Sequence, residues 1–388
     1  MNSAYVVGAL RTPIVRAGKH YARLGAEQLL GQVINALLER TGIQPEQVDH
    51  VFAGNAAGPG GNIARVAALA SALPQSTGAT SLDAQCASSL EAIAAGARMI
   101  RCGEANVVIA GGVESVSTAP WRMEKQQDQL TTPRVYSRAR FTPAPDEDPD
   151  MGVAAENIAT RYGISRERQD AFALRSHERA VAAAQSGAFA AELVPMQTAA
   201  GLVQQDTCPR PGLTTRKLAA LKPAFVTGGT VSAGNSCPIN DGAAAVLLVS
   251  DAVLQKLEPE FALRYLASGT GACDPEVLGM AASPAYQKLQ QVLGEPAVND
   301  DSLIEFNEAF AVQALACLDE LGLDERRVNQ QGGALALGHP YGASGAVLVT
   351  RLFHQARAAA LPGQRQVALM AAAGGTGTAV AFETALRR

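Results

Sequence analysis

The chain is poor in charged and aromatic side chains. Charged residues make up 18% and aromatic residues 5% of its 388 residues, and the formal net charge is −4. A slightly acidic protein has no general attraction to nucleic acid or to an anionic membrane, so an anionic ligand would need a local basic site. No run of about 18 apolar residues predicts a membrane span. We therefore expect neither a nucleic-acid-binding protein nor a membrane protein.

The cysteines show no paired spacing typical of a metal site, and a chain of this length gains little from a disulfide framework. The six are Cys86, Cys102, Cys208, Cys237, Cys273 and Cys317. The N-terminus runs directly into an expected strand at residues 4–8, without the basic, apolar and small-residue order of a signal peptide. We expect reduced thiols, no metal and a cytoplasmic protein.

Apolar residues make up 47% of the chain, and its many alanines and glycines suit close packing of helices on sheets. Residues 107–112 and 367–375 each form a near-continuous apolar strand that ends in glycines and follows an alanine-rich helix. One helix begins after Cys86 and the other after His339. We infer an α/β protein with two similar halves whose reactive turns face one cleft.

This pattern breaks between residues 117 and 242. Prolines at 120, 133, 143, 145 and 149 indicate long loops, followed by helix signals from residue 164 to 186. We expect a strand at residues 243–250 to return to the first half. The predicted domains are 1–116 plus 243–260, an inserted loop domain at 117–242, and 261–388.

Three residues are candidates for chemistry. His339 lies in GGALALGHPYGASG (332–345), where Pro340 is expected at a helix start whose free N–H groups favour an anion beside the imidazole. Cys86 precedes an expected helix through Ile100, and the helix dipole would stabilise its thiolate. Asn307 opens the motif NEAF, where it could cap a helix or hold a water or carbonyl. Taken singly, each is more often structural.

Together these residues resemble the thiolase family, whose members carry an active-site cysteine before a long helix, an Asn-Glu-Ala-Phe motif and a Gly-His-Pro motif in this order. Further matching segments are RTPI at 11–14, GGVES at 111–115, MGVAAEN at 151–157, ISRERQD at 164–170, AGN at 233–235 and INDGAAA at 239–245. The resemblance covers the full length. It implies duplicated α/β domains in a five-layer α-β-α-β-α sandwich, with a loop domain that covers the thioester ligand and helps oligomers form.

The resemblance also implies roles for single residues. Cys86 would attack a thioester carbonyl, His339 would take the thiol proton, and Asn307 would hold a water. Backbone N–H groups of Cys86 and Gly377 would stabilise the oxyanion. The ligand would be coenzyme A, a substrate or product with no tightly bound cofactor beside it. Residues expected to contact coenzyme A are Met151, Arg210, Lys217 and Cys237.

The sequence departs from the family at two positions. Alignment through the last glycines places Ala371 where most thiolases have a second cysteine, the acid or base at the carbon that is made or broken. A methyl group cannot transfer a proton, so Ala371 is either a native loss or a change introduced to trap an intermediate. Cys237 could substitute for the missing thiol, or it could simply be a packed small residue. Asp150 stands where many thiolases have a histidine, which could weaken coenzyme A binding.

Three functions remain open from the sequence. The first is thiolysis of a 3-ketoacyl-CoA or Claisen condensation of two acyl-CoAs, as in acetyl-CoA C-acyltransferases. The second is an acyltransferase or thioesterase-like enzyme that loads an acyl group on Cys86 without C–C chemistry, which Ala371 favours. The third is a non-catalytic acyl-CoA-binding subunit of a complex. A homodimer or homotetramer is expected, with a protein acceptor or complex partner as an alternative.

Overall fold

A long mixed β-sheet runs through the whole chain in the computed structural model, which describes residues 2–126, 128, 132–136, 138–144 and 148–386. Along the sheet the strands are β12 (Leu303–Phe306), β13 (Arg365–Ala372), β14 (Thr376–Leu386), β11 (Phe261–Ala272), β1 (Ala4–Arg11), β10 (Asn240–Ser250), β5 (Val107–Glu114), β3 (His50–Gly54) and β4 (Gly78–Leu82), with β2 (Val15–Arg16) beside β10. The expected strands at 4–8, 107–112 and 367–375 are β1, β5 and β13.

The sheet consists of two half-sheets joined by a narrow contact. Only Tyr5 and Val6 of β1 pair with β11, opposite Arg264 and Leu263. In each half an antiparallel set continues into parallel strands: β5, β3 and β4 in one half and β13 and β12 in the other. A parallel bridge from Ile304 to Val328 stands where the second half would have its counterpart of β4. The repeat predicted from the two apolar strands is therefore visible in the topology.

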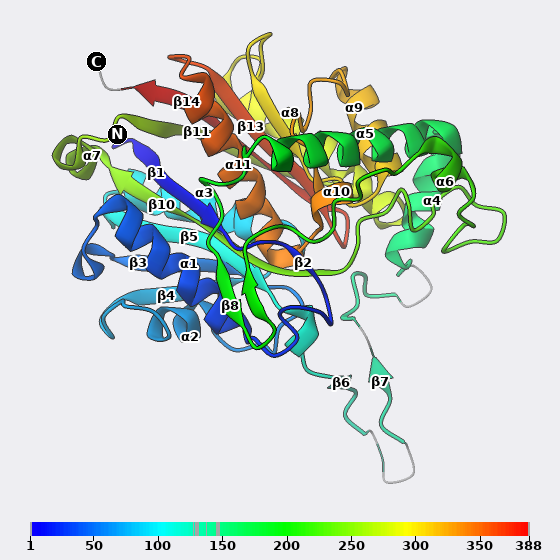
Figure 1. Cartoon of the computed structure of the whole chain (residues 1–388), viewed down its shortest axis with the longest axis horizontal. Coiled ribbons are helices and arrows are strands. Elements are labelled where there is room, and N and C mark those ends of the chain that lie inside the picture. The colour runs from blue at the N-terminus through cyan, green and yellow to red at the C-terminus, as the bar shows by residue number, and fades with distance from the viewer. Residues whose placement is uncertain (1, 127, 129–131, 137, 145–147, 387–388) are drawn as a thin grey trace.

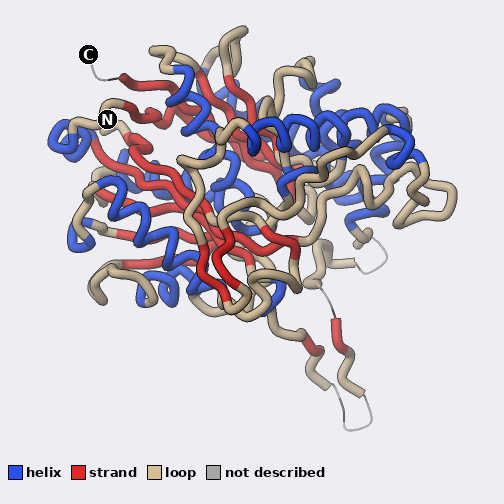
Figure 2. The backbone as a smooth tube through the Cα atoms, viewed as in Figure 1, coloured by secondary structure: helices blue, strands red, loops and turns tan. Residues whose placement is uncertain are grey.

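Helices cover both half-sheets on both faces (Figures 1 and 2). Helices α1 (Ala26–Thr41) and α2 (Ile63–Leu69) pack on the outer face of the first half, and α8 (Ala282–Leu293) and α9 (Ala311–Leu321) lie outside the second. Helices α3 (Ser88–Arg101) and α11 (Ser344–Ala359) lie between the halves and contact strands of both. The order helix, sheet, helix, sheet, helix agrees with the predicted α/β thiolase-like fold.

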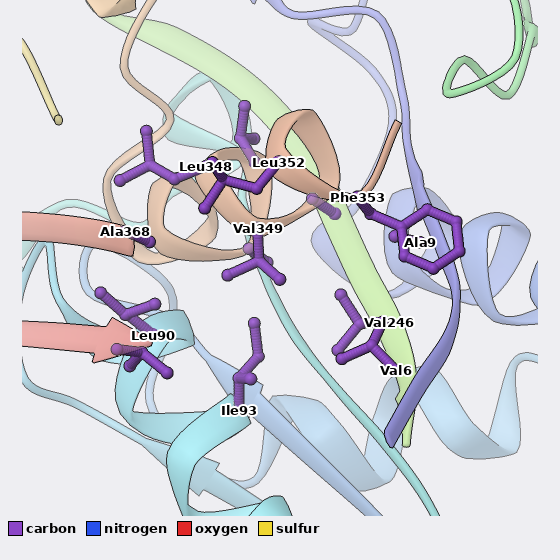
Figure 3. Packing of buried hydrophobic residues seen from close by; sticks show 14 of the residues in the cluster. Val6, Ala9, Leu90, Ile93, Val246, Leu348, Val349, Leu352, Phe353 and Ala368 are labelled. Atoms are coloured by element: carbon purple, nitrogen blue, oxygen red, sulfur yellow. The ribbon is translucent and has the colours of Figure 1, made fainter. Parts of the chain in front are cut away.

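Each boundary between these layers holds its own hydrophobic cluster. The central cluster joins Leu90 and Ile93 of α3 to Val349 and Leu352 of α11, with strand residues such as Val246 around them (Figure 3). The two outer clusters lie under α1 and α2, and under α8 and α9. Because α3 and α11 fill the centre, the turns before both helices are fixed by the same core.

The inserted segment is more regular than predicted. It contains α4 (Met151–Tyr162), α5 (Arg166–Gln185), α6 (Thr215–Ala219) and the strand pairs β6 (Arg122–Met123) with β7 (Val135–Tyr136) and β8 (Met196–Thr198) with β9 (Gly201–Val203). The β6–β7 pair projects from the body of the molecule (Figure 1). Pro145, one of the prolines used for the prediction, lies outside the described residues.

The predicted return strand begins earlier than expected. Strand β10 starts at Asn240, three residues before the predicted 243, and is buried along its whole length. Helix α7 (Asp251–Leu257) then leads to β11 and the second half. Among the described residues, no helix is long and apolar enough to cross a bilayer.

The central core can be tested with Ile93→Ala. Ile93 is fully buried between the half-sheets, so the lost contacts and the cavity left behind should lower the free energy of unfolding by about 2–5 kcal/mol. Val292→Ala on the exposed side of α8 is the control and should change it by less than about 0.5 kcal/mol. Urea unfolding measures both, and equal losses would contradict the assignment of the core.

Candidate active site

Cys86 lies in a tight turn between β4 and α3. Gln85, just before it, has a φ of 52°, a left-handed conformation that non-glycine residues seldom adopt. The hydroxyl of Ser88 stabilises this turn by accepting a hydrogen bond from the Ala84 amide at 2.9 Å and donating one to the Gln85 carbonyl. The thiol is thereby held at the start of α3, with only 7% of the residue exposed.

Burial dominates the ionisation of this thiol. Burial and, less strongly, the nearby Glu114 carboxylate raise the pKa of Cys86 to about 12, although hydrogen bonds from the amides of Ala373 and of Cys86 itself act to lower it. The helix N-terminus was expected to stabilise the thiolate, but in the free protein desolvation outweighs it. Cys86 is therefore a neutral thiol near pH 7.

Three contacts orient His339. Its backbone N–H donates to Asn240 Oδ1 at 3.0 Å, and its Nδ1 lies 2.6 Å from Ser344 Oγ at the start of α11. Its ring meets Tyr341 edge-on, with centroids 5.4 Å apart. Burial lowers the pKa of His339 to about 4, so the imidazole is neutral and Nε2 remains free to accept a proton when Nδ1 carries the hydrogen.

The helix start after His339 differs from the prediction. Pro340 precedes a short 3₁₀ helix at Tyr341–Ala343, and α11 begins only at Ser344. The amide of Gly342 donates to Glu114 Oε2 at 3.0 Å, and the amide of Ala346 donates to Ser89 Oγ at 2.9 Å. The expected anion at this helix start is thus a protein carboxylate, and these N–H groups are not available to a ligand.

Glu114 was not identified from the sequence, although it is a lone acid at the end of an apolar strand. Its carboxylate accepts hydrogen bonds from the amides of Ala56 and Ala57 and from Asn55 Nδ2, each at 2.9–3.0 Å. Burial raises the pKa of Glu114 to about 7 despite these donors. It ties the loop after β3 to the turn after His339.

Asn307 faces His339 from the end of β12. Its Nδ2 is 3.5 Å from His339 Nε2, and its backbone N–H donates to the Leu369 carbonyl of β13 at 3.1 Å. Helix α9 is preceded by Phe310, so Asn307 does not cap it. Its Oδ1 is buried and has no hydrogen-bond partner among the described residues. The side-chain amide is therefore available to hold a water or a carbonyl, which is one of the two roles predicted from the sequence.

Tyr341 connects the histidine side of the site to the cysteine side. The half-buried Tyr341, two residues after His339, has the pKa of its hydroxyl raised by burial first and then by the thiols of Cys237 and Cys86. The amide at Cys86 belongs to Ala373, just beyond β13, and β13 also holds Asn307. The described residues show no hydrogen bond between Cys86 and His339. Tyr341 and the Ala373 amide nevertheless place the histidine half of the chain close to the Cys86 thiol.

The predicted oxyanion residue Gly377 does not reach the thiol. It lies within β14, paired with Ala371 on one side and Gly271 on the other. The amide that bonds the sulfur is that of Ala373, at the turn between β13 and β14. The glycine pattern therefore identified the correct turn, but which residue of the turn bonds the sulfur depends on how β13 and β14 pair. Ala371 itself lies in β13 and is 7% exposed.

The residues expected to bind coenzyme A are spread around the insertion. Cys237 donates its backbone N–H to Ala309 at 3.0 Å, and its pKa is raised by burial and by the Cys86 thiol. Arg210 lines a cavity of about 130 Å³ together with Ser236 and Pro238, which flank Cys237. Cys237 and Arg210 thus border the same region beside the reactive thiol.

Met151 and Lys217 are placed less directly. Met151 begins α4, next to Gly152, which packs against Phe225, and Phe225 meets Phe310 edge-on at 6.0 Å. Lys217 is exposed on α6 and donates to the Gly212 carbonyl at 2.7 Å. This edge-on pair of Phe225 and Phe310 was not identified from the sequence.

Asp150 lies in the insertion and contacts Arg138. It precedes α4, and one of its carboxylate oxygens lies 3.2 Å from Arg138 Nε. The described residues contain no group of three or more histidine, cysteine, aspartate or glutamate side chains placed to bind a metal.

Alkylation of Cys86 by iodoacetamide tests the ionisation of the site. Because the pKa of the thiol is raised to about 12, the thiolate fraction and hence the rate should rise about tenfold per pH unit between about pH 7 and pH 9. Peptide mapping separates Cys86 from the exposed Cys102, and Cys86→Ala verifies the assignment. A rate that is already constant across this range would show a preformed thiolate and contradict the prediction.

Comparison with known proteins agrees with this geometry. The thiolase N-terminal domain family matches residues 4–252, and the thiolase C-terminal domain family matches residues 259–384. The chain is 40% identical to a putative acetyl-CoA C-acetyltransferase VraB of Staphylococcus haemolyticus, covering 99% of both chains. It is 42% identical to a beta-ketoadipyl-CoA thiolase of Acinetobacter baylyi, covering 92% of this chain and 93% of the relative. The crystal structure of the Bacillus anthracis acetyl-CoA acetyltransferase superposes with a TM-score of 0.92 at 33% identity, covering 99% of both chains. The chain belongs to the thiolase family and is an acyltransferase.

Proposed function

We propose that this acyltransferase takes the acyl group of an acyl-CoA onto Cys86 and acts as an acetyl-CoA C-acyltransferase, cleaving or forming a 3-ketoacyl-CoA. The observation that carries the proposal is the position of the Cys86 thiol. The Ala373 amide of the second half hydrogen-bonds it, and the same thiol raises the pKa of Tyr341, two residues after the His339 that pairs with Asn307. The relatives named above as acetyl-CoA acetyltransferases and as a beta-ketoadipyl-CoA thiolase support the same activity.

The first half-reaction uses neutral groups. Cys86 Sγ attacks the thioester carbonyl carbon while His339 Nε2 accepts the thiol proton. The N–H groups of Cys86 and Ala373 then donate to the oxyanion of the tetrahedral intermediate, a contribution of several kcal/mol for a well-placed pair. Collapse of the intermediate breaks the C–S bond to coenzyme A, whose sulfur takes the proton from His339. Ser344 holds the imidazole in the tautomer that this sequence needs.

The second half-reaction requires a proton transfer at carbon. Ala371 cannot supply it, so another group must serve. The Cys86 thiol raises the pKa of Cys237, and this proximity supports Cys237 as the substitute.

A second candidate function, acyl transfer from Cys86 to another acceptor without C–C chemistry, is favoured by Ala371 alone. A non-catalytic acyl-CoA-binding role receives no support from the names of the relatives.

We assign coenzyme A, as substrate and product, to the side of the site lined by the insertion. Arg210 and Lys217 would contact its phosphates or nucleotide, and Met151 and Cys237 would contact its pantetheine arm. All six cysteines are unpaired, which supports the cytoplasm as the compartment. The exposed apolar residues Trp121, Met123 and Val135 on the projecting β6–β7 pair support a homodimer or homotetramer.

Intact-mass measurement after incubation with acetyl-CoA tests the acyl-enzyme. One acetyl group should add to the protein and be absent from Cys86→Ala, and His339→Ala should slow its formation by about 10²–10⁴ because no base removes the thiol proton. Consumption of acetoacetyl-CoA in the presence of coenzyme A then reports C–C cleavage. Absence of any adduct from the unmodified protein would refute the proposal.

The variant Ala371→Cys tests the missing acid or base. A thiol at this position should raise the rate of acetoacetyl-CoA cleavage by up to about 10²–10⁴ while leaving acetylation of Cys86 unchanged. Ala371→Ser, which adds an oxygen of similar size but with a far higher pKa, is the control for added volume. An unchanged cleavage rate in Ala371→Cys would mean that another group already performs the transfer, and Cys237→Ser should then abolish cleavage.

A further inference from the structure

A small internal cavity lies behind the catalytic amide, on the side of α11. Its volume is about 10 Å³, and the residues that line it include Glu305, Asn307, Gly338, Ser344 and Arg351. A cavity of this size is at the lower limit for one water molecule, and a buried water needs two to four polar partners. The lining of this cavity provides them.

Two of the lining residues carry buried polar atoms without a protein partner. Asn307 Oδ1 is an acceptor and Arg351 Nε is a donor, and neither has a hydrogen-bond partner among the described residues. Both residues are only 1% exposed. An unsatisfied buried polar atom is costly, and these two atoms, one an acceptor and one a donor, belong to residues that line the same water-sized cavity.

The remaining nitrogens of Arg351 are held by other groups. Its Nη1 lies 3.1 Å from Glu192 Oε1, which also binds Arg11, and its Nη2 donates to Gln331 Oε1 at 3.0 Å. These contacts fix the plane of the guanidinium and leave only Nε for the cavity. Glu305, whose other contact is with Gln355 at 2.7 Å, adds a further acceptor.

We propose that one buried water in this cavity accepts a hydrogen bond from Arg351 Nε and donates one to Asn307 Oδ1, which makes Arg351 a positioning residue for the catalytic amide. The water's second hydrogen is directed to Glu305. With Oδ1 held in this way, Nδ2 must face His339 Nε2, as observed at 3.5 Å. Without the water, the amide could turn over and place an oxygen lone pair against the imidazole nitrogen.

The kinetic part of this inference rests on the proposed acyl transfer through Cys86. Arg351→Lys keeps a positive charge near Glu192 but places a methylene at the position of Nε. We expect it to lower kcat for exchange of label between acetyl-CoA and free coenzyme A by about tenfold, because a misplaced catalytic group is costly even when binding is intact. The KM for acetyl-CoA should change by less than about twofold.

Gln331→Leu is the matched control. It removes the partner of Arg351 Nη2, but Glu192 still holds Nη1 and so keeps Nε in place, and exchange should proceed at the unmodified rate. Equal losses in Arg351→Lys and Gln331→Leu, or an unchanged kcat in Arg351→Lys, would overturn the positioning role. A thermal unfolding curve for each variant separates loss of folded protein from loss of rate.

A high-resolution crystal structure of the unmodified protein tests the water without any activity, and it decides the question if Arg351→Lys does not fold. The expected result is density for one water within hydrogen-bonding distance of both Arg351 Nε and Asn307 Oδ1. A cavity without density, or an amide turned so that Nδ2 faces Arg351, would overturn the inference. If the unmodified protein catalyses no exchange, the proposed function fails. The crystal structure still decides whether the cavity holds the water.

Discussion

The site depends on the close approach of α3 and α11 in the middle of the molecule. Gly345, in the first turn of α11, lies so near α3 that a Cβ at this position would be 2.5 Å from the amide nitrogen of Leu90. At the residues next to these two, Ser89 Oγ accepts from the Ala346 amide at 2.9 Å. A larger residue at 345 would push the two helix starts apart. Cys86 precedes one of these starts and His339 the other, so their relation is set by packing between elements some 250 residues apart in sequence.

The same packing makes the thiol and the imidazole buried and electrically neutral. Burial raises the pKa of the Cys86 thiol and lowers the pKa of the His339 imidazole, and both shifts favour the uncharged form. In the proposed reaction, the proton is therefore transferred only when the thioester arrives and an oxyanion develops. Backbone N–H groups in a site of low polarity stabilise that oxyanion more strongly than water could. Burial thus postpones charge separation to the step in which charge is needed.

The sequence predicted the features that depend on local pattern. The apolar runs of β5 and β13 and the helix after Cys86 were readable, because strand and helix periodicity and turn residues are local properties, whereas the roles of Cys86, His339 and Asn307 stay predictions. The resemblance to thiolases supplied the fold and the roles.

Features that depend on distant contacts were not readable. Asn240 holds the His339 amide from 99 positions away, and the amide at Cys86 is that of Ala373 rather than Gly377. The expected thiolate at Cys86 was wrong because the helix dipole can be read from sequence whereas the depth of burial cannot. Pro340 likewise starts a 3₁₀ turn because Gly342 must reach Glu114.

The central claim is that one carbonyl oxygen can be held jointly by backbone from both halves of the chain. A crystal structure of the protein acetylated on Cys86 measures this directly. The account predicts that the acetyl oxygen accepts hydrogen bonds from the amides of both Cys86 and Ala373, with His339 on the opposite side of the thioester. An acetyl oxygen that points away from the Ala373 amide, or an acetyl group on a different residue, would contradict it.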